Sequence, residues 1–240
     1  MVLSPNINHF FVTALQQRCS VVTNPENGET VIIDGGGDSD RIIKWLDHGI
    51  GDSDYEIGEY SGERKVVALL NTHAHFDHSG DIPYFKEHYG LEWWLHQDDF
   101  FLQSLAKESA KRYGISLPEP AVAENTWNNG EIHSFAGMEF QIIHTPGHTL
   151  GGCCLRLVVN DGPDHLFAGD TLFQGSIGRT DLPNSGGNLD LLLRMIRERL
   201  WPLDDETIVH PGHGPLTTIG VEKDTNPFLN EGFRGRGAWL

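Results

Sequence analysis

The sequence predicts an α/β fold in which an opening group of strands is followed by alternating helices and strands. Three observations support this class. Residues 66–70 are consecutive aliphatic residues, typical of a strand buried on both faces. Residues 81–113 alternate between helical and strand patterns. Polar side chains recur directly after apolar strands, and open α/β layers place their sites at that edge.

The first third of the chain predicts a strand meander and one helix. Strands are expected at residues 11–15, 19–23 and 30–34, and the turn signal at 24–28 joins the last two. Residues 41–46 have helical spacing, with Ser39 or Asp38 as the expected N-cap. The glycines at residues 35–37, between the third strand and this helix, lack the G-x-G-x-x-G and Walker spacings. They therefore indicate a tight turn rather than a phosphate site. Residues 49–64 are polar and glycine-rich, which predicts a surface insertion.

The remaining elements follow the buried strand at residues 66–70. A helix is expected at 81–89, a strand at 91–96 and a longer helix at 98–113, ended by Gly114. An irregular connection at 118–129 leads to strands at 139–143 and 155–159. No internal repeat appears, and one domain over residues 1–240 is the expected organisation.

Composition excludes several classes of partner. The chain has 34 acidic and 17 basic residues and a formal net charge of −17, so its field repels nucleic acid. No window approaches the ~18 apolar residues of a membrane span, which predicts a soluble protein. The amino terminus lacks a secretory pattern. Cys19, Cys153 and Cys154 form no disulfide framework, which favours reduced, buried thiols and a cytoplasmic location.

The stretch from Thr72 to His78 is the strongest chemical signal. It places His73, His75, Asp77 and His78 directly after the buried strand. In extended chain, residues 73 and 75 project to the same side, so two imidazoles can converge on one ion. Imidazole and carboxylate together suit zinc, iron or manganese. The pattern therefore predicts a metal site, with a chance cluster of histidines in a polar loop as the alternative.

Three further patches follow later strands. They are the segments 144–149, 168–171 and 210–214, and each combines a candidate ligand with Gly or Pro that can turn the backbone sharply. If these strands share an edge with the buried strand, the patches converge on the same site.

These residues resemble the metallo-β-lactamase superfamily. Its H-x-H-x-D-H motif is matched by the histidine stretch, the T-P-G-H-T histidine by His148, the bridging aspartate of G-D by Asp170 and the last histidine by His213. Within the superfamily the chain is most similar to short bacterial glyoxalase II-like (hydroxyacylglutathione hydrolase-like) proteins, which lack a C-terminal helical domain. Residues 173–181, 211–216 and 226–229 show that likeness.

The resemblance implies a four-layered αββα sandwich and two divalent metal ions, zinc first, with iron or manganese as alternatives. One ion would be held by His73, His75 and His148, and the other by Asp77, His78 and His213. Asp170 would bridge the two ions, and Asp77 would also orient the attacking water.

The implied activity is hydrolysis of a thioester, S-lactoylglutathione or a similar hydroxyacyl thioester, by a hydroxide that bridges the ions. A thiolate leaves readily because its pKa is about 8.5, so no external acid is needed. A persulfide dioxygenase with one iron is the main alternative. A lactonase and a non-catalytic metal-binding module are weaker ones. The partner is a small-molecule thioester, and the sequence does not predict an oligomeric state.

Residues outside the ligand set are also assigned roles. Arg179 is expected to bind a carboxylate of the thiol carrier, with a salt bridge to Asp181 as the equal alternative. Asp181 stands where glutathione-binding relatives have tyrosine. Asp34 is expected to accept a proton from a ligating imidazole. His144 and His210 are expected to support or pack near the site rather than bind metal. Surface or core roles are expected for His9, His48, His88, His96, His133 and His165.

Overall fold

The computed structural model describes residues 4–230, so residues 1–3, on which the expected absence of a secretory signal partly rests, and residues 231–240 lie outside it. The amino-terminal half forms a mixed six-stranded sheet in the order β4-β1-β2-β3-β5-β6, in which β3, β5 and β6 run parallel. Its strands are β1 (Asn6–Val12), β2 (Gln17–Thr23), β3 (Glu29–Ile33), β4 (Tyr55–Ile57), β5 (Lys65–Leu70) and β6 (Trp93–Trp94).

The second half forms another six-stranded sheet, in the order β14-β13-β10-β9-β8-β7, in which only β10 and β13 pair in parallel. A two-stranded ribbon, β11 (Leu172–Phe173) and β12 (Ser176–Ile177), lies beside it. The sheet strands are β7 (Ile132–Phe135), β8 (Met138–His144), β9 (Cys153–Leu157), β10 (His165–Gly169), β13 (Ile208–Pro211) and β14 (Thr217–Thr218).

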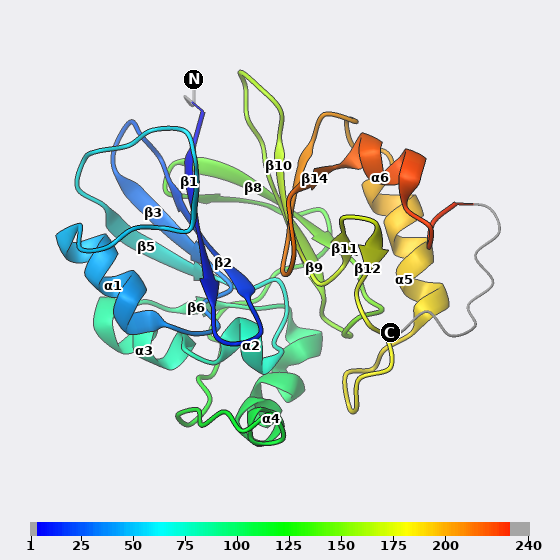
Figure 1. The fold of residues 1–240 in the computed structure, drawn as a ribbon, viewed down its shortest axis with the longest axis horizontal. Coiled ribbons are helices and arrows are strands. Elements are labelled where there is room, and N and C mark those ends of the chain that lie inside the picture. The colour runs from blue at the N-terminus through cyan, green and yellow to red at the C-terminus, as the bar shows by residue number, and fades with distance from the viewer. Residues whose placement is uncertain (1–3, 231–240) are drawn as a thin grey trace.

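Helices cover the outer face of each sheet (Figure 1). No helix in residues 4–230 is long and apolar enough to cross a membrane. The first sheet is covered by α1 (Ser39–His48) and α3 (Ile82–Tyr89), and the second by α5 (Leu189–Met195), a π-helical turn (Ile196–Leu200) and α6 (Ile219–Thr225). At the site edge lie α2 (Phe76–Ser79), a 3₁₀ turn (Gln97–Asp99) and α4 (Phe100–Lys111).

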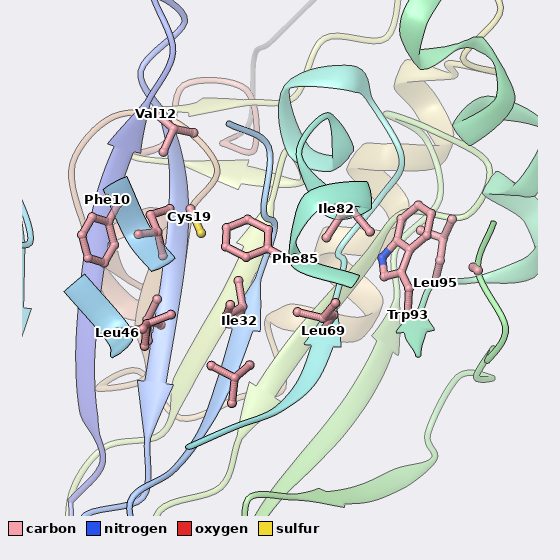
Figure 2. Close-up of a cluster of buried hydrophobic side chains, with 14 of the residues drawn as sticks. Phe10, Val12, Cys19, Ile32, Leu46, Leu69, Ile82, Phe85, Trp93 and Leu95 are labelled. Carbon is pink, nitrogen blue, oxygen red and sulfur yellow. The ribbon is translucent and has the colours of Figure 1, made fainter. Parts of the chain in front are cut away.

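Three apolar clusters fill the spaces between these four layers. Figure 2 shows the first, in which Phe10, Ile32 and Leu69 of the first sheet meet Leu46 of α1 and Phe85 of α3. A second cluster joins the inner faces of the two sheets, and a third joins the second sheet to α5 and α6. The expected four-layered αββα sandwich is therefore confirmed. The three cysteines are free and buried, as expected.

One local expectation is wrong, and two others are confirmed only in part. The first strand begins at Asn6 and ends at Val12, because Asn6, Asn8 and His9 are polar but buried in pairing with β2, whereas residues 13–16 form a turn. Asp38 is the N-cap residue of α1, as expected, but its carboxylate accepts from the Thr13 amide and makes no cap hydrogen bond. The region 49–64 is largely exposed, but it contributes the edge strand β4.

The topology brings the candidate ligands to one edge. Parallel strands present their carboxyl ends at the same edge of a sheet. Asp34 follows β3 and His73 follows β5 in the first sheet, while Asp170 follows β10 and His213 follows β13 in the second. The two sheets face each other, so these four loops converge.

Candidate metal centre

The first cluster is formed by three histidines from two distant segments. His75 Nδ1 lies 3.1 Å from His73 Nε2 and 2.8 Å from His148 Nε2. His73 is buried in the loop after β5, and His75 occupies the N-cap position of α2 in extended conformation. Three imidazole nitrogens thus meet within the separation of ligands around one ion.

The second cluster lies beside the first and combines a carboxylate with two histidines. Asp77 Oδ2 lies 3.2 Å from His213 Nε2 and 3.9 Å from His78 Nε2. Asp77 and His78 lie on the single turn of α2, and His213 comes from the loop after β13. The donor set is again typical of zinc, iron or manganese.

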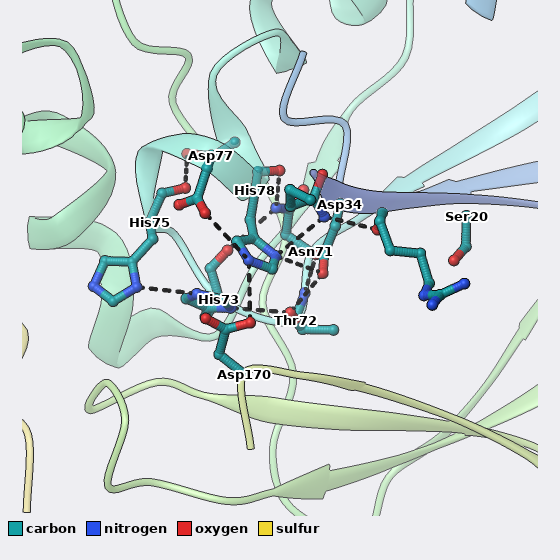
Figure 3. Close-up of polar contacts among 12 residues, drawn as sticks. Ser20, Asp34, Asn71, Thr72, His73, His75, Asp77, His78 and Asp170 are labelled. Carbon is teal, nitrogen blue, oxygen red and sulfur yellow. Dashed lines mark hydrogen bonds and ion pairs between the residues drawn. The ribbon is translucent and has the colours of Figure 1, made fainter. Parts of the chain in front are cut away.

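Asp170 lies between the clusters. Its Oδ2 is 3.5 Å from His148 Nε2 in the first cluster, whereas its Oδ1 is 3.3 Å from His78 Nε2 and 3.8 Å from His213 Nε2 in the second. Figure 3 shows this carboxylate facing His73 and His78. One oxygen therefore faces each cluster, the arrangement of a bridging ligand. All seven predicted ligands are brought together.

The outer nitrogens of the five ligand histidines are all held by oxygen atoms. The carbonyls of Arg179 and Leu15 can only accept, so Nδ1 of His148 and Nδ1 of His213 must donate. The contacts are His73 Nδ1 to Thr72 Oγ1 at 3.1 Å, His75 Nε2 to Ser185 Oγ at 2.8 Å, His78 Nδ1 to Asp34 Oδ2 at 2.9 Å, His148 Nδ1 to Arg179 O at 2.6 Å and His213 Nδ1 to Leu15 O at 3.1 Å.

Where the outer partner can only accept, as for His78, His148 and His213, the contact leaves the inner nitrogen of a neutral imidazole as a lone pair. A neutral imidazole has one N–H, so a histidine that donates outward presents an acceptor inward. His148 therefore presents a lone pair at Nε2 toward the first cluster, and neutral His78 and His213 present theirs toward the second. In addition, His78 Nε2 and Asp170 Oδ1 are buried without a hydrogen-bond partner. The residues therefore fit metal ions in both clusters.

The charges of the site are consistent with this fit. Burial lowers the pKa of His75 to about 3 and that of His148 below its usual value, so both are neutral near pH 7. Burial alone would lower the pKa of His78, but the carboxylates of Asp170, Asp34 and Asp77 raise it well above its usual value. A carboxylate cluster that attracts a proton to His78 attracts a divalent cation more strongly.

The backbone around the site leaves no room for larger residues. A Cβ atom at Gly212 would lie 2.3 Å from Asp170 Oδ1 and 2.6 Å from His78 Cε1. The loop after β13 therefore needs glycine at this position to bring His213 against the other ligands.

Sequence analysis missed two supporting residues. The buried carboxylate of Asp99 accepts from the Ala74 amide, the Thr149 hydroxyl and the Gly151 amide, which ties the loop containing His73 to the loop containing His148. Ser185 is buried against His75. Asp99 belongs to a polar helix start and Ser185 to a polar loop, so no sequence pattern distinguishes either residue.

The other predicted residues lie around the clusters. Asp34 accepts from His78 Nδ1 and also from the amide and hydroxyl of Thr72, at 2.7 Å each (Figure 3). Arg179 forms a two-point salt bridge with Asp181 at 2.9 Å. His210 contacts His9 and His165 rather than a ligand, and the His144 imidazole contacts the Leu150 carbonyl.

The clusters form the floor of an open pocket of about 660 Å³. Five of the ligands line it, and its walls come from α4, the loop around Arg179 and the turn after β1. The wall residues are Leu15, Phe76, Leu102, Ser109, Arg112, Tyr113, Phe173, Arg179, Leu182, Pro183 and Ser185. A small molecule with both apolar and anionic parts could reach the metal clusters here.

The chain is similar to several known proteins. The family model described as the metallo-beta-lactamase superfamily matches residues 12–213. The hydroxyacylglutathione hydrolase GloC of Haemophilus influenzae is 40% identical over 94% of this chain and 98% of its own. The crystal structure of the BLEG-1 B3 metallo-beta-lactamase is 34% identical, with a TM-score of 0.79 over 93% of this chain and 99% of that one. TTHA1623, solved in a di-iron-bound form, is 33% identical, with a TM-score of 0.74 over 92% and 99%.

Proposed function

This chain belongs to the metallo-beta-lactamase superfamily, and we propose that it is a metal-dependent hydrolase of hydroxyacyl thioesters of glutathione, such as S-lactoylglutathione. The observation that supports this most directly is Asp170, which presents one oxygen to each of two ligand clusters on the floor of an open pocket. The similarity to a hydroxyacylglutathione hydrolase over nearly the full length of both chains supports the substrate class.

The ligand clusters fit two divalent ions, zinc or iron in our proposal. His73, His75 and His148 would hold one ion, Asp77, His78 and His213 the other, and Asp170 both. Two ions so placed would supply a nucleophile from water at neutral pH and polarise the acyl carbonyl.

Residues around the ligands orient the imidazole rings and the water. The hydrogen bonds to Thr72, Ser185, Asp34 and two backbone carbonyls fix each imidazole ring, which keeps the ligand geometry rigid. Asp77 is partly exposed to the pocket and, in this proposal, would hold a water on the pocket side. The three thiols are buried, and burial raises the pKa of each, so none is a plausible nucleophile.

The test is thiol release from S-lactoylglutathione by protein loaded with zinc or iron, with metal content measured on the same sample. We expect hydrolysis at close to two ions per chain, and loss of activity in Asp77→Asn. Glu139→Gln, an exposed change on β8 far from the loops of the site, is the control. No hydrolysis of any glutathione thioester by protein with both ions bound would contradict the proposal.

A second candidate activity is hydrolysis of β-lactams, because the BLEG-1 structure is similar over nearly its whole length. The same loaded protein should therefore be assayed with a chromogenic cephalosporin. Two measurements would distinguish a persulfide dioxygenase from the proposed hydrolase. The dioxygenase would contain one iron per chain and would take up oxygen with glutathione persulfide. The second cluster of Asp77, His78 and His213 favours the hydrolase, since a mononuclear enzyme would not need it.

A further inference from the structure

Two arginines line the pocket, and they differ in whether their charge is already neutralised. Arg179 donates from Nε and a terminal nitrogen to both carboxylate oxygens of Asp181. That pair offsets the charge of Arg179, and a substrate carboxylate would have to displace Asp181. Arg112 has no acidic side chain within ion-pair distance anywhere in residues 4–230. It is therefore the available cation of the pocket.

Arg112 lines the same pocket as the metal clusters. It caps the C-terminal end of α4, where the helix dipole favours a cation. The next residue, Tyr113, is exposed, and its ring packs 5.3 Å from the ring of Phe76, which lies between the ligands His75 and Asp77 in the chain. This packing fixes the end of α4 beside the site.

The negative charge of the whole protein favours a cation in the pocket for binding an anionic substrate. The net charge of −17 repels a substrate with carboxylates, and Asp77 and Asp170 at the pocket floor add to that repulsion in the absence of metal. A thiol carrier of the glutathione type has two carboxylates remote from its sulfur. An unpaired guanidinium on the pocket wall can bind one of them through two parallel hydrogen bonds.

We propose that Arg112, assisted by the hydroxyl of Tyr113, binds a carboxylate of the thiol carrier and so determines preference for anionic thioesters. The proposal rests on the proposed function and adds the residues that recognise the carrier. Arg179 contributes less, because Asp181 competes with the substrate for it.

A binding experiment tests this without reference to catalysis. The zinc-loaded enzyme is titrated calorimetrically with S-methylglutathione and with its diethyl ester, in which both carboxylates are masked. Arg112→Gln should weaken binding of the acid by ~10-fold, as expected for loss of a charged hydrogen-bonded contact, and leave the ester unchanged. Tyr113→Phe should have a smaller effect of the same kind.

Matched variants separate a specific contact from general charge. Lys111→Gln removes one positive charge from the same helix end, but Lys111 does not line the pocket, so its binding should equal wild type. Asp181→Asn should tighten binding of the acid by freeing Arg179. Equal losses in Arg112→Gln and Lys111→Gln, equal losses for acid and ester, or no binding of the acid to wild type would each overturn the proposal.

Kinetics distinguish failure of this inference from failure of the proposed function. If S-lactoylglutathione is hydrolysed, Arg112→Gln should raise KM about 10-fold and leave kcat nearly unchanged, because the contact is equal in ground and transition states. Hydrolysis with an unchanged KM in that variant would refute the role of Arg112 and retain the hydrolase. Conversely, selective binding of S-methylglutathione without hydrolysis would retain the role of Arg112 and refute the hydrolase.

Discussion

Asp34 supports the site through three hydrogen bonds, and its backbone has a φ of 58°, in the left-handed region. Asn also tolerates that conformation, so Asp34→Asn changes the chemistry without adding backbone strain. One of its oxygens becomes an amide that cannot accept from His78 or Thr72. We expect metal affinity to fall 10- to 100-fold, roughly the effect of losing such a partner elsewhere, in competition with a chromogenic chelator.

Asp38→Asn is the control for that variant, because Asp38 is exposed and has a φ of 52° but lies outside the site. Its metal affinity should equal wild type. If Asp34→Asn also keeps wild-type affinity, the contact with His78 does not tune the metal centre.

A second prediction at the residue scale concerns the contribution of Asp99 to the stability of the fold. Its buried carboxylate accepts from three donors, so in Asp99→Asn an N–H group would face another N–H or the Thr149 hydroxyl. Such an unsatisfied buried group costs about 1–3 kcal/mol of unfolding free energy. Urea unfolding of metal-free protein should show this loss, whereas Asp98→Asn, at a half-exposed neighbour, should not. Equal stability of the two variants would refute the role of Asp99.

At the scale of elements, three buried histidines join the two sheets. His9 of β1 lies 3.0 Å from His210 of β13, which lies 2.9 Å from His165 of β10. Burial lowers the pKa of all three, with Arg18 adding to the effect on His9 and His210, while Asp164 partly opposes it for His165. They are therefore neutral in the folded protein near pH 7.

Because these pKa values are depressed, the unfolded chain binds more protons than the folded one below the unfolded histidine pKa of about 6.5. The stability they contribute is present above that pH and is lost as the pH falls toward 4, by up to about 1.4 kcal/mol per pH unit for each histidine. We expect His9→Gln to reduce the slope of unfolding free energy against pH between 6.5 and 4.5 in urea titrations. Slopes identical to wild type would show that His9 does not titrate on unfolding.

The same elements show what could be predicted from the sequence. The strands near residues 19–23, 30–34 and 66–70 are rich in aliphatic residues, so the sequence pattern alone predicts their positions. The first strand lies earlier than predicted because its polar residues are buried with partners: Asn8 donates to Asn6 within the strand, and His9 contacts His210 of the other sheet, which no local pattern reveals. The helices α5 and α6 are not among the predicted elements, and their apolar residues pack against the second sheet.

The grouping of the seven candidate ligands could be predicted for a different reason. Four of them form one dense stretch, and the other three lie in short motifs with Gly or Pro, whereas Asp99, Ser185 and Arg112 reach the site from segments with no motif of their own. Their roles depend on contacts between distant loops, and such contacts are visible only in three dimensions.

At the scale of the whole molecule, the metal centre joins the two halves of the sandwich. His73, His75, Asp77 and His78 follow the first sheet, while His148, Asp170 and His213 come from the second. A metal ion that binds the folded chain but not the unfolded one stabilises it, by about 4 kcal/mol when the free ion is about a thousand-fold above Kd. Metal removal should therefore lower the thermal midpoint of the entire domain in one transition, because both sheets lose their shared anchor.

Asp170→Ala tests whether the two ions act as a unit. Asp170 faces both clusters, so its loss should weaken both ions together, and added zinc should raise the thermal midpoint far less than in wild type. His213→Ala, which removes a ligand of the second cluster only, should keep about one tightly bound ion per chain by elemental analysis and a partial zinc-dependent rise in the midpoint. If Asp170→Ala retains both ions, or behaves like His213→Ala, Asp170 does not bridge them, and the clusters are independent sites.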